Sequence, residues 1–256
     1  MKTRHSLAGT IAAALMAVLL PLAAQPAQAA TIVWSAPQNI TSDTDVFTND
    51  SLFAAANFAS STVTVNGVTF NAFPITAGGT SASSGNITVS TQTGTGFSVS
   101  TVSSSGGAFA ALTTAYKTLL SPALTQSGLS NQLRFTLSNL TVGSTYTIQY
   151  WVNDSRNNGF GRTTNVGTQN LQANVPDTDG GLGQYVRGTF VADTSSQSFT
   201  ASVGPNAPGG FGGNFTYANA MQVRVVPEPS TIFLAVVGLV SAEGIRRSRR
   251  RTARAC

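Results

Sequence analysis

The residues that build most catalytic and metal-binding sites are nearly missing from this chain. Of its 256 residues one is cysteine, Cys256, one is histidine, His5, and the stretch from Thr31 to Val226 contains no glutamate. A lone cysteine cannot form a disulfide within the chain. Without histidine, the central stretch has no serine–histidine–aspartate or cysteine–histidine catalytic group and no histidine-based zinc site. A glycosidase would need two aspartates as its carboxylate pair, and no aspartate here has a context that favours this role, so we expect no catalytic residues and no enzyme activity.

Charged side chains are also scarce, at 9% of the chain, although the formal net charge is +5. Between Thr31 and Val226 there are six basic and seven acidic residues, so this central stretch carries a net charge of −1. The excess of positive charge is therefore confined to the two ends of the chain. Basic ends follow the rules of membrane topology, so the high isoelectric point does not predict a nucleic-acid partner.

The first 29 residues have the three parts of a secretory signal peptide. Lys2 and Arg4 form a basic start, an apolar run extends from Leu7 to Leu22, and Ala27 and Ala29 supply the small residues of a cleavage site. We expect cleavage after Ala29 and export of the remaining chain. An uncleaved membrane anchor is the alternative.

The composition of residues 30–226 predicts one all-β domain. Gly, Ser, Thr and Asn are abundant, and β-branched residues recur throughout this stretch. About nine or ten candidate strands, separated by turns, are typical of an antiparallel β-sandwich. The clearest hairpin is Thr62–Phe70, because Asn66-Gly67 suits a two-residue type I′ turn that places the hairpin's apolar side chains on one face.

One short helix is expected in residues 30–226, which we call the body, and it should lie between Ala108 and Leu124. Its apolar side chains recur at helical spacing: Leu112, Ala115, Tyr116, Leu119 and Leu120. Pro122 should end this helix. We expect the helix to pack across the sheet edge or mouth as a cover.

Two alternating strands are predicted at residues 132–138 and 145–153, paired through the turn between them. In the second strand, one face is apolar and aromatic and should belong to the core. The opposite face carries Trp151 among hydrogen-bonding side chains and continues into a polar segment that begins at Asp154.

The end of that second strand is the part of the body that most resembles a ligand-binding site. An aromatic face can pack against a sugar ring, while planar amide, carboxylate and guanidinium groups can bind its hydroxyls. The sequence therefore predicts a carbohydrate site formed by Trp151, Asn153, Asp154 and Arg156, helped by Tyr185 and Arg187. In the alternative, Asp154 and Arg156 form a structural pair that closes a loop, and Trp151 covers the sheet edge.

A metal site is only weakly indicated. Asp43 and Asp45 stand in a polar, turn-prone segment and can offer oxygen ligands to calcium. The glycine and the distal glutamate of an EF-hand loop are missing, so that motif is excluded. Solvated turn carboxylates are the alternative, and no other metal or cofactor is predicted.

The C-terminal stretch, residues 227–256, combines a polar motif, a short apolar run and a basic tail. The motif consists of Pro227, Glu228, Pro229, Ser230 and Thr231. An apolar run follows from Ile232 to Ala242, shorter than the usual 20 or so residues of a full membrane span. The tail carries five arginines: Arg246, Arg247, Arg249, Arg250 and Arg251. Arginines that stay in the cytoplasm would leave the body outside the membrane, in agreement with the signal peptide.

This arrangement resembles the PEP-CTERM sorting signal of Gram-negative bacteria that make exopolysaccharide. The resemblance implies recognition by an exosortase, a membrane protease-transpeptidase that cuts near Pro227–Pro229. It also implies a protein anchored in the inner membrane by its C-terminus before processing, and then located at the cell surface or outside the cell. Glu243, which interrupts the change from apolar residues to arginines, is a departure from the usual pattern.

The body itself resembles secreted bacterial modules with a jelly-roll or galactose-binding-like sandwich. The likeness is carried by Val-Asn-Gly-Val-Thr-Phe at 65–70, Trp-Val-Asn-Asp-Ser-Arg at 151–156, and Gly-Leu-Gly-Gln-Tyr-Val at 181–186. Two functions remain open: a surface protein that binds exopolysaccharide, or a structural component of the envelope or biofilm without a small ligand. Five Asn-x-Ser/Thr sequons are compatible with glycosylation in the second case.

Overall fold

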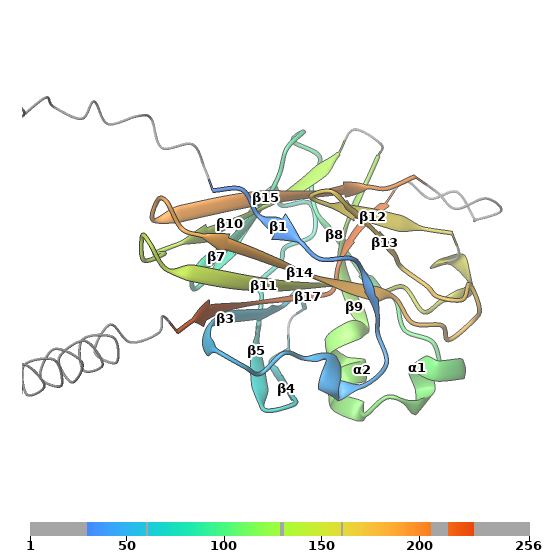
Figure 1. Cartoon of the computed structure of the whole chain (residues 1–256). Helices are drawn as coiled ribbons and strands as arrows, with labels where there is room; N and C mark the ends of the chain where they lie inside the picture. Colours follow the sequence, from blue (N-terminus) through green and yellow to red (C-terminus); the bar gives the residue numbers. More distant parts are fainter. Residues whose placement is uncertain (1–29, 60, 129–130, 160, 206–214, 228–256) are drawn as a thin grey trace, which may run out of the picture.

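The computed structural model describes residues 30–59, 61–128, 131–159, 161–205 and 215–227. These residues form a body built mostly of β-strands (Figure 1). The predicted signal peptide and all of the predicted sorting signal except Pro227 lie outside the described residues. Within the described residues, no helix has the length and apolar character that a membrane crossing requires.

The first of the two large sheets carries the strands that position the candidate site. Its order is β1-β14-β11-β17-β3-β5-β4, and β2 also pairs with β14. All its pairs are antiparallel except β3 with β5, which is parallel. Its strands are β1 (Val33–Trp34), β2 (Gln38–Asn39), β3 (Ser51–Asn57), β4 (Val63–Val65), β5 (Val68–Ala72), β11 (Thr145–Val152), β14 (Gln184–Val191) and β17 (Ala220–Val226).

A six-stranded antiparallel sheet and a small three-stranded one complete the body. The six-stranded sheet has the order β13-β12-β15-β10-β7-β6, and the small sheet has the order β16-β9-β8. Their strands are β6 (Ser81–Ser84), β7 (Ile87–Thr91), β8 (Ser98–Thr101), β9 (Pro122–Ser127), β10 (Gln132–Ser138), β12 (Thr163–Val166), β13 (Gln169–Gln172), β15 (Ser196–Val203) and β16 (Phe215–Ala218).

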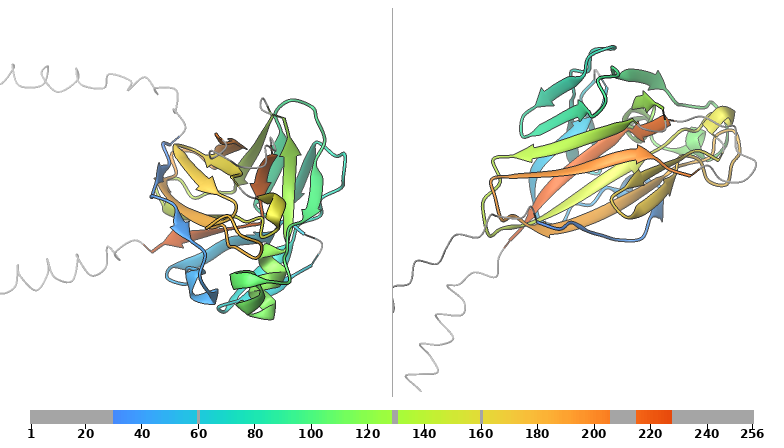
Figure 2. Two further views of the ribbon diagram at one scale, coloured as in Figure 1. Left: turned by 90° about the vertical axis from the view of Figure 1, so that its right-hand side faces the viewer. Right: turned by 90° about the horizontal axis from the view of Figure 1, so that it is seen from above.

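The main core lies between the two large sheets, which form two layers (Figure 2). Phe135 on β10 packs edge-on against Tyr150 on β11, with ring centroids 5.3 Å apart, and stacks on Phe199 of β15 at 5.1 Å. Aromatic side chains from both layers are thus buried together, where they contribute most to hydrophobic stabilisation. The prediction of an all-β body in largely antiparallel sheets is confirmed, and its two layers are consistent with a β-sandwich. The described residues form seventeen strands, more than the nine or ten expected, because several are only two to four residues long.

The hairpin predicted at Thr62–Phe70 is also confirmed. Val65 pairs with Val68 and Val63 pairs with Phe70. Asn66 and Gly67 close the turn with positive φ angles of 47° and 76°, as a type I′ turn requires.

The predicted pairing of residues 132–138 with 145–153 is wrong. Both strands exist, as β10 and β11, but β10 pairs with β7 and β15 whereas β11 pairs with β14 and β17. The connection at 139–144 crosses from one layer to the other. Alternation shows only that each strand has one apolar face, and two strands packed face to face satisfy this as well as two strands in one sheet.

The helical segment contains two short helices instead of one, α1 (Gly107–Ala111) and α2 (Thr114–Leu120). The break falls at Thr113, whose side-chain oxygen accepts a hydrogen bond from the backbone N–H of Tyr116 and so caps α2. The second helix ends at Leu120, before Pro122 opens strand β9.

The helix α2 covers the outer face of the first sheet, close to the β4–β5 hairpin (Figure 1). Its side chains Tyr116, Leu119 and Leu120 enter a second hydrophobic cluster together with Trp151. The helix therefore acts as a cover, as predicted, but it lies over the outer face of the sheet and not at its edge or mouth. The outer face of β11 beneath it is closed to solvent.

Candidate functional site

Trp151 does not offer an exposed platform. Its side chain is 0% exposed, its indole N–H donates a hydrogen bond to the phenol oxygen of Tyr116 at 3.1 Å, and its ring packs edge-on against Phe70 at 5.7 Å. The prediction that its face binds a sugar ring is wrong, because α2 and the β4–β5 hairpin cover that face. Sequence alternation placed Trp151 opposite the main core but could not show a second cluster above it.

Asn153 is equally buried and is occupied by backbone groups. Its amide oxygen accepts hydrogen bonds from the backbone N–H of Gly183 at 3.0 Å and from the hydroxyl of Ser155 at 3.2 Å. Its own backbone N–H donates to the side-chain oxygen of Asn219 at 2.7 Å. Asn153 therefore joins three chain segments and does not face a ligand.

Asp154 is the centre of an ion-pair cluster. Its fully buried carboxylate accepts two hydrogen bonds from Arg156, each at 2.8 Å, and lies 3.4 Å from Arg162. Hydrogen bonding to Asp154 raises the pKa of the Arg156 guanidinium. Arg162 also donates to the hydroxyl of Tyr217, and burial, with the nearby Asp154 charge, raises the pKa of that phenol. This geometry is that of the alternative, a structural pair that closes a loop.

Tyr185 and Arg187 form a separate group on the outer face of β14, and they are more exposed than Trp151, Asn153 and Asp154. The guanidinium carbon of Arg187 lies 4.7 Å from the ring centroid of Phe47 and 5.6 Å from that of Tyr185. All three side chains are half-buried. We name this group the aromatic–arginine patch, with Phe47, Tyr185 and Arg187 as its members.

The charge of Arg187 has no counterpart in the part of the chain that the structure describes. No described carboxylate lies within 4.0 Å of it, and its buried Nε atom has no hydrogen-bond partner. A buried donor without a partner is costly, and each such case requires an explanation. The two rings hold the guanidinium by cation–π contact but supply no acceptor for its N–H groups.

Two buried glutamines hold Phe47 in place. The amide oxygen of Gln149 accepts from the backbone N–H of Phe47 at 3.0 Å, and its amide nitrogen donates to the carbonyl of Asp45 at 2.7 Å. Gln222 donates to the carbonyl of Phe47 at 3.0 Å. Sequence analysis missed Phe47 because it reaches Arg187 from a segment 140 residues earlier, and no local pattern indicates such a contact.

Asp43 and Asp45 are engaged within the protein. Asp45 accepts hydrogen bonds from the backbone N–H groups of Thr41 at 2.6 Å and Ser42 at 3.0 Å, and Asp43 accepts from the hydroxyl of Thr113 at 2.8 Å. Across the described ranges, no three His, Cys, Asp or Glu side chains are grouped so that they could hold a metal ion. These contacts favour the alternative in which both aspartates are turn carboxylates, but Asp45 is buried and not solvated as expected.

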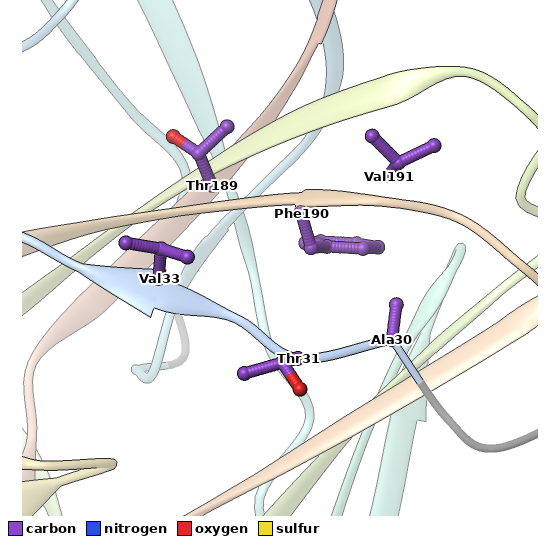
Figure 3. Close-up of a pocket in the computed structure, with 6 residues that line it drawn as sticks. All are labelled: Ala30, Thr31, Val33, Thr189, Phe190 and Val191. Atoms are coloured by element: carbon purple, nitrogen blue, oxygen red, sulfur yellow. The ribbon is translucent and has the colours of Figure 1, made fainter.

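An apolar cavity of about 450 Å³ opens beside β1 and the end of β14 (Figure 3). It is lined by Ala30, Thr31, Val33, Thr189, Phe190 and Val191. Only two of these side chains, the threonines, carry a hydroxyl, and none carries a charge or an amide. This lining does not suit the ring hydroxyls of a sugar, which need several convergent polar groups.

Comparison of the chain with protein-family models, with curated proteins and with solved structures finds no match in any of the three. A functional proposal for this protein therefore depends on its own residues and their geometry.

Proposed function

We propose that this is an exported surface or matrix protein, sorted through residues 227–251 by an exosortase, whose body binds an acidic polysaccharide. The body would be a jelly-roll-like sandwich, a proposal supported by its two antiparallel layers and by the crossing from β10 to β11. It is not an enzyme in this proposal, and no metal takes part in binding. The membrane would hold it through residues 232–242 until the signal is processed.

The unpaired guanidinium of Arg187 is the observation that carries the polysaccharide proposal. Its flat donor group matches a carboxylate, as on a uronic acid, and the part-exposed rings of Phe47 and Tyr185 can pack on the apolar faces of sugars. A half-buried patch on the outer face of a strand suits a polymer, which does not need to be enclosed. The predicted site thus keeps Tyr185 and Arg187 and replaces Trp151, Asn153, Asp154 and Arg156 by Phe47.

Binding of the full-length protein, in detergent, to alginate tests this proposal. Because a hydrogen bond to a charged group contributes roughly 1.5–3 kcal/mol, we expect Arg187→Gln to weaken binding about tenfold or more. Arg134, an exposed arginine on β10, provides the matched control, and Arg134→Gln should leave binding unchanged. Binding should also fall as salt is raised, because the contact is electrostatic.

Neutral and sulfated polymers complete the experiment. Dextran should bind much more weakly than alginate, and a sulfated dextran distinguishes a general preference for anions from a preference for carboxylates. If Arg187→Gln and Arg134→Gln weaken binding equally, the proposed site is wrong. If no polymer binds, the second function remains, a structural envelope component without a small ligand.

A further inference from the structure

Large apolar side chains are exposed mainly at one end of the body. In the described part of the chain they are Val33 (72% exposed), Val142 (61%), Val191 (54%), Leu52 (45%) and Val99 (45%). Isolated exposed apolar residues are common and need no explanation, but a group of them at one place indicates an interaction surface. All except Val99, which lies on β8, belong to such a group.

The register of the first sheet places two of these exposed side chains, Val191 and Leu52, near Val226, where the chain leaves the body. Thr145, the first residue of β11, pairs with Val226 on one side and with Val191 on the other. Leu52 on β3 pairs with Arg224, two residues before that exit. In Figure 1 the end of β17, the start of β3 and the end of β14 lie at the same, left-hand side of the body.

The other two exposed side chains, Val142 and Val33, lie close to the end of β14. Val142 belongs to the β10–β11 connection, whose Gly143 N–H donates to the carbonyl of Ala192 at 2.8 Å. Val33 on β1 pairs with Thr189 on β14. It also lines the apolar cavity together with Val191 (Figure 3). The cavity and the four exposed side chains Val33, Leu52, Val142 and Val191 thus form one surface, which we name the exit-end surface.

We propose that the exit-end surface rests on the lipid bilayer that holds the C-terminal segment. This inference depends on the membrane anchoring in the proposed function. Only five residues, 227–231, separate Val226 from the predicted membrane segment at 232–242. The six residue steps from Val226 to Ile232 span at most about 22 Å, so the exit end is held within that distance of the bilayer. Apolar side chains there remove hydrocarbon surface from water when they enter the headgroup region.

The same orientation presents the aromatic–arginine patch away from the lipid. Tyr185 and Val191 lie near opposite ends of β14, six residues and therefore about 20 Å apart. A body seated on its exit end would hold Tyr185 and Arg187 clear of the membrane surface, where an extended polymer can reach them. Tyr185 would then lie near the end of β14 away from the membrane, and Arg187 near the middle of the strand, about 13 Å from Val191.

Fluorescence quenching in vesicles tests the proposal on the full chain. Cys256→Ser removes the native thiol, and single variants Val142→Cys, Val191→Cys, Val99→Cys and Val236→Cys carry a small fluorophore. The vesicles contain phosphatidylethanolamine and phosphatidylglycerol with brominated acyl chains. Since interfacial groups lie roughly 5–10 Å into the headgroup boundary, we expect quenching at positions 142 and 191 to be about threefold or more above that at 99.

Position 236, within the predicted membrane segment, separates the two possible failures. Strong quenching at 236 with equal, weak quenching at 142, 191 and 99 would overturn the exit-end proposal and leave the anchoring intact. Weak quenching at 236 as well would overturn the anchoring and the exit-end proposal together. If labels at 142 and 191 are shielded from aqueous iodide but not quenched by bromolipid, a second copy of the chain covers this surface and the proposal is wrong.

Discussion

The indole N–H of Trp151 donates a hydrogen bond to the phenol oxygen of Tyr116 across 3.1 Å, and both side chains are fully buried. The phenol in turn lies 3.4 Å from a carboxylate oxygen of Asp45 and donates to it. A residue predicted to bind sugar is thus part of a hydrogen-bonded chain that joins the first sheet, the helix α2 and the turn at 43–45. The relationship explains why the outer face of β11 is closed at Trp151, whereas Tyr185, one strand further along on β14, is only half-buried.

Tyr116→Phe should destabilise the protein by about 1–3 kcal/mol, because it leaves the buried indole N–H of Trp151 without an acceptor. The free energy of unfolding in urea is the measurement. Tyr185→Phe is the matched control, since that half-buried phenol makes no hydrogen bond to any residue in the described ranges, and it should cost less than about 0.5 kcal/mol. Equal losses in the two variants would show that the Trp151–Tyr116 bond has no special role.

Asp154→Asn should lower stability by about 3–5 kcal/mol, because it leaves Arg156 and Arg162 without their shared buried carboxylate. Thermal unfolding gives the measurement, and Asp179→Asn, at an exposed position, is the control. Alginate binding by the fraction that stays folded should not change. A specific loss of binding in Asp154→Asn would return this residue to the ligand site.

Alkaline pH should unfold the body. Burial raises the pKa of Tyr116, Tyr150 and Tyr217 above the ordinary value of 10.0, so above pH 10 the folded state keeps protons that the unfolded state releases. The stability from these groups is complete below pH 10 and is lost as the pH rises beyond it. Absorbance of tyrosinate against pH should show these three titrating only as the protein unfolds. Their titration in a folded protein near pH 10 would contradict the assignment.

Gly183→Ala should prevent folding or cost about 3 kcal/mol or more, because a Cβ there would fall on the carbonyl oxygen of Val152. Gly85→Ala is the control. A Cβ at Gly85 meets no atom within 4 Å, so only its positive φ of 56° opposes the change, at a cost of roughly 1 kcal/mol. Expression level and the urea midpoint report both effects. A Gly183→Ala variant as stable as Gly85→Ala would mean that the loop before β14 can move away from β11.

The sandwich was predictable because alternation and turn chemistry act over short distances. The hairpin at 62–70 shows this clearly, since Asn66 and Gly67 specify both the turn and its register. The site was predictable only in part. Tyr185 and Arg187, which belong to the proposed patch, were named from the sequence as helpers of the region at 151–156, whereas Phe47 was missed because its contact with Arg187 depends on how distant segments pack.

By itself the sequence determined the all-β class, the hairpin at 62–70, the scarcity of catalytic side chains and the expected route of export. These depend on composition and on neighbours along the chain, which local physical rules describe. Only the tertiary structure decided that β10 and β11 lie in different layers, that α2 buries Trp151, and that Phe47 lies against Arg187. Each of these depends on which apolar face packs against which, and a strand pattern shows that a face is apolar without showing its partner.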